Sequence, residues 1–216
     1  MCIRDRIYQL HDITSRHVAE SRLNHIAYHD DLTGLANRHS FHEALETAVE
    51  RTRLDAGYRF AVLYLDLDRF KLVNDSLGHG AGNELLREVA ARLRASVRPV
   101  DLVARLGGDE FAALVEAVGD PDIALQLADR VLDELSRPTY LLGTELTSGV
   151  SVGITFSDLG YRTADEIMRD VDLAMYEAKA AGRGRVVRFD TSMHRKVAEK
   201  LALETDLRRA IGDRCV

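Results

Sequence analysis

The 216-residue sequence has little cysteine, no long hydrophobic run and no excess of positive charge. Its two cysteines, Cys2 and Cys215, lie at opposite ends of the chain, so the sequence predicts neither a zinc site nor a disulfide framework. The first residues lack the apolar core of a signal peptide, and no segment reaches the roughly 20 apolar residues that cross a bilayer. We therefore expect a cytoplasmic protein with no membrane contact in this segment.

The charge balance argues against a general nucleic-acid binder. The chain has 29 Lys and Arg against 35 Asp and Glu, a formal net charge of -6. Nucleic-acid binding needs a surplus of cations to neutralise the phosphate backbone, so we expect no nucleic-acid partner, and any phosphate ligand must be held by a few placed cations. The hydrophobic content of 46% is sufficient for one sizeable core, which predicts a single domain with attached helices.

Hydrophobic periodicity predicts alternating helices and strands. Apolar residues at helical spacing predict helices over 15–29, 40–49, 85–97, 124–135 and 163–178, with a short helix after 69–75 and a last helix from Met193. Strand patterns occur over 7–13, 60–65, 102–104, 111–115, 146–156 and 186–189. With one hairpin in the middle, this order predicts an α+β fold with a ferredoxin-like split β-α-β core, whose mainly antiparallel sheet is flanked by helices.

Two adjacent glycines and two adjacent acids, Gly107-Gly108-Asp109-Glu110, lie between two short apolar runs. The glycines predict a tight hairpin turn, with both acids directly after it. Neighbouring carboxylates repel each other unless a cation or a proton lies between them. On these residues alone, a charged hairpin tip and a functional site remain equally open.

Another pair of acids, Asp66 and Asp68, follows the apolar run over 60–65, which has the character of a buried central strand. Carboxylates at the end of such a strand are costly to desolvate unpaired, so a metal or a cationic partner is favoured over side chains that merely face solvent. Backbone N–H groups at the start of the following helix would suit phosphate. The glycines between 78 and 82 lack the P-loop spacing, and we expect them to turn the chain.

Cations gather at the end of the helix over 163–178. Lys179, Arg183 and Arg185 follow one another within seven positions. Cations at a helix C-terminus complement the helix dipole, and they can equally hold phosphate. The residues themselves leave both interpretations open.

Together these motifs resemble the GGDEF family of diguanylate cyclases. The segment from Gly107 to Phe111 is the family signature, and the segment from Asp30 to Arg38 resembles its amino-terminal turn. Asp66-Leu67-Asp68-Arg69-Phe70-Lys71 with Asn74-Asp75 and Gly78-His79 resembles its metal and nucleotide segment, and 173–183 its closing helix. The resemblance covers roughly 30–190 and implies a fold like that of adenylyl cyclases and polymerase palms.

The resemblance implies condensation of two GTP molecules into cyclic di-GMP with release of pyrophosphate, using Mg²⁺ or Mn²⁺, two per active half-site. A divalent cation would lower the pKa of the attacking 3′-hydroxyl and offset developing charge. The metal ligands it implies are Asp66, the Leu67 carbonyl, Asp109 and Glu110, and the catalytic residues are Glu110, Asp109 and Lys71. The implied substrate-binding residues are Asn74, Asn83, Arg69, Phe70, Gly108, Lys179 and Arg183.

Two further features carry over from the family. Each domain binds one GTP, so catalysis implies a homodimer. Arg98-Pro99-Val100-Asp101 matches the family's RxxD inhibitory site, in which Arg98 and Asp101 bind product, and this implies product inhibition by cyclic di-GMP.

One position departs from the family pattern. The family usually has Gly-Asp where this chain has Gly82-Asn83, and the acid accepts hydrogen bonds from guanine. An amide offers one acceptor oxygen and two donors, so bidentate acceptance is lost. Weaker GTP binding or relaxed purine specificity is therefore expected.

The ends of the chain resemble parts of neighbouring domains. Residues 1–29 resemble the last strand and exit helix of a PAS sensor, residues 30–190 the GGDEF domain, and 191–216 the linker that leads to an EAL phosphodiesterase domain. This context supports an alternative function, a catalytically silent GTP-binding module that regulates a neighbouring EAL domain. The retention of Asp66, Asp109, Glu110 and Lys71 favours an enzyme.

Overall fold

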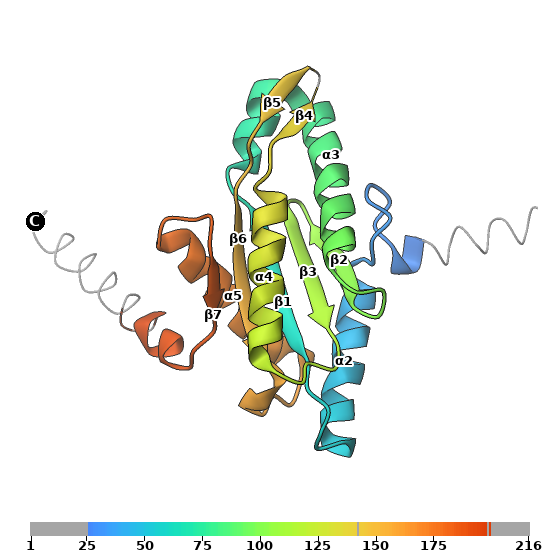
Figure 1. Ribbon diagram of the computed structural model, residues 1–216, viewed down its shortest axis with the longest axis vertical. Helices are drawn as coiled ribbons and strands as arrows, with labels where there is room; N and C mark the ends of the chain where they lie inside the picture. The colour runs from blue at the N-terminus through green and yellow to red at the C-terminus, as the bar shows by residue number, and fades with distance from the viewer. Residues whose placement is uncertain (1–25, 142, 198, 200–216) are drawn as a thin grey trace, which may run out of the picture.

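The computed structural model describes residues 26–141, 143–197 and 199, shown in colour in Figure 1. The strand expected over 7–13, most of the helix expected over 15–29 and most of the last helix lie outside the described residues. No helix within the described part of the chain is both long and apolar enough to cross a membrane.

Five strands form the main sheet, and four long helices accompany them. In chain order the elements are α2 (Arg38–Leu54), β1 (Ala61–Leu67), α3 (Phe70–Ser96), β2 (Leu102–Gly107), β3 (Glu110–Val115), α4 (Pro121–Leu135), β4 (Thr139–Leu141), β5 (Thr144–Leu146), β6 (Val150–Phe156), a 3-10 turn (Ser157–Leu159), α5 (Ala164–Ala180) and β7 (Val186–Arg188).

The sheet order is β2-β3-β1-β6-β7, with every pair antiparallel except β6 and β7. The succession β1-α3-β2 and β3-α4-β6 is the split β-α-β arrangement, with β7 added at one edge. The predicted α+β, ferredoxin-like fold with a mainly antiparallel sheet is confirmed.

Helices cover both faces of the sheet, so β1 is buried along its whole length (Figure 1). Successive side chains of a strand point to opposite faces. Leu63 and Leu65 of β1 belong to the core with α3 and α4, whereas Val62 and Tyr64 belong to the core with α2 and α5. The run of apolar residues that predicted a central strand is therefore explained by helices packed on both of its faces.

Helix α5 approaches β6 most closely at Gly153. A Cβ atom at this position would lie 2.3 Å from the Val171 carbonyl oxygen and 2.5 Å from the Met175 nitrogen. Both are main-chain atoms of α5, so neither can move aside without moving the helix. The absence of a side chain at Gly153 thus sets how near α5 lies to the sheet.

The strand expected over 146–156 is wrong in its first part. Residues 144–146 form β5, which pairs with β4 in a separate hairpin, and β6 begins only at Val150. Between them the chain turns toward Asp68, whose N–H donates to the Gly149 carbonyl at 2.9 Å. The polar and glycine residues over 147–149 are typical of a loop, a signal that the expected strand did not take into account.

Two helix boundaries also differ from expectation. The glycines between 78 and 82 were expected to turn the chain, but among the residues of α3 only Gly78 has non-helical angles (φ 83°, ψ 162°), and the helix continues to Ser96 beyond this kink. Helix α4 begins at Pro121, three residues before the expected start, because Asp120 caps it and proline is favoured at the first helical position.

Candidate active site

Three carboxylates converge where β1 ends. Asp66 is the residue opposite Glu110 in the antiparallel register of β1 and β3, and the N–H of Leu67 donates to the Asp109 carbonyl at 3.3 Å. The hairpin turn consists of Gly108 and Asp109, one residue later than predicted, since Gly107 pairs with Glu110. The two acids of the hairpin are thereby brought to the acid of the central strand.

Lys179 of α5 reaches this group of acids. Its Nζ lies 2.6 Å from Asp66 Oδ2. Burial raises the pKa of Asp66 above its ordinary value, and the nearby charges of Asp109 and Glu110 raise it further, against the opposing effect of Lys179. Asp66 is thus a desolvated carboxyl group with more negative than positive charge around it.

Glu110 is held by two side chains that the sequence did not single out. Arg38, at the start of α2, lies with Nη2 3.3 Å from Glu110 Oε2, and its Nε donates to the Leu106 carbonyl at 3.0 Å. Tyr64 lies close to Glu110, and the pKa of Tyr64 is raised by burial first and then by the charge of Glu110. The alternation of β1 places Tyr64 on the same face as Asp66, which was the available signal, but a tyrosine in an apolar run has the pattern of a core residue.

Asp172 of α5 is a further acid near this group. Its pKa is raised by burial and then by the charge of Glu110, while Lys179 opposes the rise. The sequence analysis did not identify Asp172. It adds to the negative potential that surrounds Lys179.

The hairpin is fixed to the amino-terminal turn through Arg105. Arg105 Nη1 lies 2.9 Å from Asp30 Oδ2, and its Nη2 donates to the Gly108 carbonyl at 2.8 Å. Burial raises the pKa of Asp30, but hydrogen bonds from Thr33 and Arg105 outweigh this effect and leave the pKa below its ordinary value. The turn from Asp30 to Arg38 therefore supports the signature hairpin from both sides, by Arg105 and by Arg38.

The donor set suits a divalent cation. Carboxylate and carbonyl oxygens are the ligands that Mg²⁺ and similar hard cations prefer. Asp66, Asp109 and Glu110 provide three carboxylates near one lysine, and burial raises the pKa of Asp66. In the described part of the chain, no three His, Cys, Asp or Glu side chains are arranged closely enough to coordinate a metal ion without changing their positions. The residues present fit the chemistry of such an ion.

The first turn of α3 begins beside these acids. Arg69 precedes the helix in the left-handed conformation (φ 62°), and its side chain does not cap the helix. Phe70, Lys71 and Asn74 follow on the first turns. Asn74 and Phe70 face Gly82 in the second half of α3, where a Cβ atom would lie 1.9 Å from Asn74 Oδ1 and 3.2 Å from Phe70 Cζ. The structure therefore places Asn74 beside the Gly82-Asn83 pair, and Asn83 is exposed there.

Arg183, in the loop after α5, lies near the loop that joins β1 to α3. It too has a left-handed backbone (φ 64°), and its Nε is 3.7 Å from Asp68 Oδ1. Asp68 also accepts from Ser151 Oγ at 2.8 Å and from the N–H of Gly184 at 3.2 Å. Asp68 is therefore a buried acid that joins three loops, rather than a partner of the carboxylates around Asp66.

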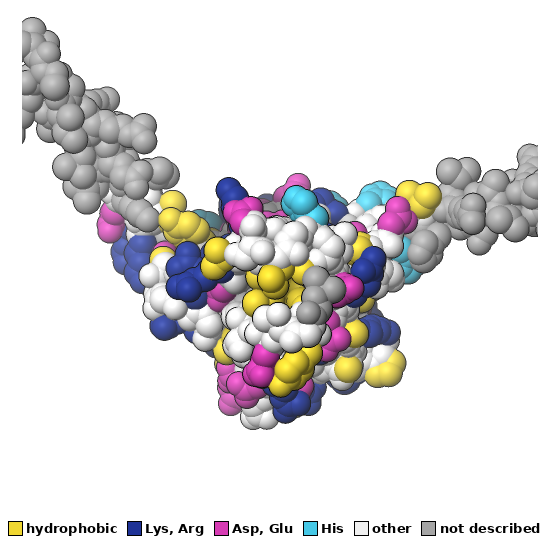
Figure 2. Space-filling model, turned by 90° about the horizontal axis from the view of Figure 1, so that it is seen from above, with side chains coloured by type: hydrophobic (Ala, Val, Ile, Leu, Met, Phe, Trp, Pro, Cys, Tyr) yellow, Lys and Arg dark blue, Asp and Glu magenta, His cyan; other side chains and the backbone are white. Residues whose placement is uncertain are grey.

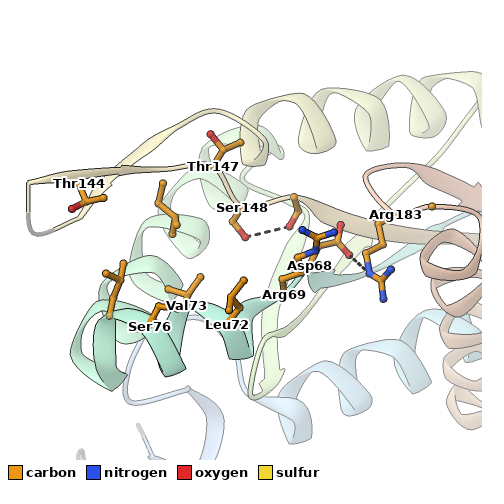
Figure 3. A pocket seen from close by; sticks show the side chains of 13 residues that line it. Asp68, Arg69, Leu72, Val73, Ser76, Thr144, Thr147, Ser148 and Arg183 are labelled. Carbon is orange, nitrogen blue, oxygen red and sulfur yellow. Dashed lines mark hydrogen bonds and ion pairs between the residues drawn. The ribbon is translucent and has the colours of Figure 1, made fainter.

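A hollow of about 560 Å³ opens next to this junction (Figure 3). It lies between α3, the chain from β5 to β6, and the loop after α5. Seen from the end of the molecule that carries β4 and β5, hydrophobic side chains gather in the middle of the face, and charged ones of both signs lie toward its edges (Figure 2).

The residues expected at an inhibitory site lie elsewhere. Arg98 and Asp101 precede β2, whereas the turn at Gly108 follows its other end. Arg98 Nη2 lies 2.8 Å from Asp101 Oδ1, and Asp101, whose side chain is fully buried, also accepts from the N–H groups of Arg98 and Glu116 at 2.9 and 3.1 Å. Arg98 Nη2 also donates to the Glu116 carbonyl at 2.6 Å. The pair is thus an ordered unit remote from the carboxylates.

Comparison with known proteins identifies the family. The family model described as "Diguanylate cyclase, GGDEF domain" matches residues 27–185. The bifunctional diguanylate cyclase/cyclic di-GMP phosphodiesterase MucR of Pseudomonas aeruginosa is 43% identical over 201 residues, which are 93% of this chain and 29% of MucR. The chain thus spans less than a third of that relative.

Solved structures agree with this match. The GGDEF domain of TpbB from Pseudomonas aeruginosa superposes with a TM-score of 0.76 at 37% identity, covering 79% of this chain and 99% of that one. The coiled coil and GGDEF domain of DgcB from Caulobacter crescentus, in complex with c-di-GMP, has a TM-score of 0.76 at 26% identity and covers 87% and 100%. Sequence, fold and the site at the end of β1 agree: this chain belongs to the GGDEF family of diguanylate cyclase domains.

Proposed function

We propose that this chain is an active diguanylate cyclase domain, which condenses two GTP molecules into cyclic di-GMP and releases pyrophosphate. The observation that carries the proposal is the convergence of Asp66, Asp109 and Glu110, with Lys179 2.6 Å from Asp66. Without a cation, such a group of acids lowers the stability of the fold. With a divalent cation it can bind a phosphate.

In this proposal Asp66, the Leu67 carbonyl and Asp109 hold Mg²⁺ or Mn²⁺, two ions per half-site, with Glu110 as a further ligand or as the base. The ions lower the pKa of the 3′-hydroxyl and offset charge on the α-phosphate. Arg38 pairs with Glu110 at 3.3 Å, and Tyr64 lies beside it, so both would orient the carboxylate. A carboxylate held in this way can receive the 3′-hydroxyl proton without first reorganising.

The remaining roles concern the nucleotide. The phosphates bind to the backbone N–H groups at the start of α3, at Arg69 and Phe70. Further contacts come from Gly108, Lys71, Lys179 and Arg183. Asn74 and Asn83 flank Gly82 and meet the base. Since each domain binds one GTP, two copies face each other as a homodimer, and the pair of Arg98 and Asp101 binds the product through Arg98, which the buried Asp101 holds in place.

The deciding experiment incubates the purified chain with GTP and Mg²⁺ and separates the products by chromatography. We expect cyclic di-GMP and pyrophosphate, and no product when the ion is removed by a chelator. Binding of GTP without turnover would instead support the alternative, a silent module that regulates a neighbouring domain, which is consistent with a chain that covers only 29% of a bifunctional relative.

A second candidate is a cyclase with relaxed purine specificity. The observation that favours it is Asn83, beside Asn74, where a carboxylate would accept both guanine N–H groups. Asn83→Asp should raise the selectivity for GTP over ATP, measured as the ratio of kcat/KM for the two nucleotides. An unchanged ratio would exclude this candidate.

A further inference from the structure

The hollow beside α3 is separate from the proposed purine site. Leu72 and Ser76 line it, whereas Asn74 points to Gly82. Residues two positions apart on an α-helix point about 200° apart, so Asn74 lies on the opposite side of the helix from Leu72 and Ser76. At about 560 Å³, the hollow lies within the size range of small-molecule sites.

One end of the hollow is cationic. Arg69 and Arg183 both line it, and both have left-handed backbones (φ 62° and 64°), which side-chain-bearing residues adopt at a cost. Asp68 between them already accepts from Ser151 and Gly184. None of the described residues accepts a hydrogen bond from the Arg69 guanidinium or forms an ion pair with it. The hollow therefore offers positive charge that its own acid does not fully compensate.

The rest of the hollow is apolar with hydroxyl groups at its edge. Leu72 is 59% exposed although it lies in a concave surface, and Val73 and Leu146 continue the apolar wall. Figure 3 shows the side chains of Ser76, Thr144, Thr147 and Ser148 around the same space. An apolar body placed here would cover Leu72, and the hydroxyl groups would give it orientation.

We propose that this hollow binds a small organic anion, whose acid group pairs with Arg69 and Arg183 and whose apolar or aromatic body covers Leu72 and Leu146. The site is additional to the proposed cyclase site but shares Arg69 and Arg183 with its phosphate-binding group. An occupant should therefore weaken binding of the nucleotide phosphates, and the hollow would act as a regulatory site.

The first test needs no nucleotide, so it does not depend on cyclase activity. The probe is anilinonaphthalene sulfonate, titrated by fluorescence into the full chain, and phenylnaphthylamine is its uncharged counterpart. We expect saturable binding of the sulfonate roughly tenfold tighter than that of the amine, since only the sulfonate can form charge-assisted hydrogen bonds with the arginines. Equal affinities would overturn the assignment of an anion.

Matched variants locate the probe. Ser76→Trp should fill the hollow and weaken sulfonate binding at least about tenfold, while Ala91→Trp, also exposed on α3 but outside the hollow, should leave it unchanged. Leu72→Ser removes apolar contact without adding bulk and should weaken binding less. Equal binding to the Ser76→Trp and Ala91→Trp variants, both folded by circular dichroism, would refute the site.

Discussion

Glu110 illustrates how single side chains turn a charged hairpin into a site. Taken alone, an acid after a glycine turn is solvated and has no fixed direction. Here Arg38 lies 3.3 Å from one of its oxygens and Tyr64 approaches from the buried strand β1. The orientation of Glu110 is therefore specified by one residue at the start of a helix and one in the core.

We expect Glu110→Gln to lower cyclase turnover by a factor on the order of 10²–10⁴, the usual contribution of a positioned base. The amide keeps the shape of the side chain, so GTP binding should change much less than kcat. Steady-state product formation and nucleotide binding would be measured side by side. Glu43→Gln, on the exposed surface of α2, serves as the control and should retain full turnover.

At this scale the sequence pointed to Asp66, Asp109 and Glu110, because acids at the end of a buried strand and after a glycine turn are costly without a cationic partner, and their roles stay predictions. It did not predict Tyr64 or Asp172. Tyr64 has the pattern of a core residue, and its closeness to Glu110 depends on the register of β1 with β3. Asp172 is brought near Glu110 only by the packing of α5. Both depend on tertiary geometry that local pattern does not encode.

Among the helices and strands, α3 contains a glycine, Gly82, whose lack of a side chain leaves room for Asn74. A Cβ atom at Gly82 would fall 1.9 Å from Asn74 Oδ1, whereas one at Gly80 would meet nothing within 4 Å. The same substitution at these two positions therefore separates intrinsic helix propensity from the packing of Asn74.

We expect Gly80→Ala to stabilise the domain by about 0.5–1 kcal/mol, because alanine is the better helix former. Gly82→Ala should displace Asn74 and weaken GTP binding roughly tenfold. Chemical denaturation and nucleotide titration of both variants would test this. Similar GTP affinities for the two variants would show that the position of Asn74 does not matter for the nucleotide.

The stability that the turn from Asp30 to Arg38 gives to the domain is expected to depend on pH. The pKa of Asp30 is lower in the folded protein than its ordinary value, so its stabilising effect is complete above the unfolded pKa of about 3.9 and is lost as pH falls through the folded pKa. Asp30→Asn should destabilise the domain by about 3 kcal/mol at neutral pH, since it breaks a mostly buried pair with Arg105.

The measurement is urea denaturation of both proteins from pH 7 downward. The difference in unfolding free energy should shrink below pH of about 4, as Asp30 becomes protonated in the original chain. Asp31→Asn changes an exposed neighbour and should have little effect at any pH. A difference that stays constant to low pH would assign the loss to geometry rather than to charge.

The elements themselves were predicted unevenly. Strand β1, helix α5 with its cap at Thr163 and the hairpin of β2 and β3 were anticipated because local signals agree with the tertiary fold. The β4–β5 hairpin was not anticipated: the expected strand ran from Leu146 through 147–149, although these polar and glycine residues are typical of a loop, and the chain bends there toward Asp68. The hydrogen bond from the Asp68 N–H to the Gly149 carbonyl fixes this bend in the fold.

At the scale of the whole molecule, the proposed product site and the proposed catalytic site lie at opposite ends of β2. Arg98→Ala should raise the inhibition constant for cyclic di-GMP at least about tenfold, because a charged contact to the product is lost. Arg94→Ala is the control, since Arg94 donates to the Asp101 carbonyl but not to its carboxylate. Initial rates at increasing product concentration would be compared, and unchanged inhibition in Arg98→Ala would refute the product site.

The contact between Gly153 and α5 also limits how this domain can be altered. A scan of substitutions over the whole chain would show position 153 to be intolerant, although Gly153 is not among the proposed site residues. Even a methyl group there would push α5 outward and carry Lys179 away from Asp66. Engineers who wish to transplant the catalytic residues onto another scaffold would have to copy this spacing between backbones as well as the side chains.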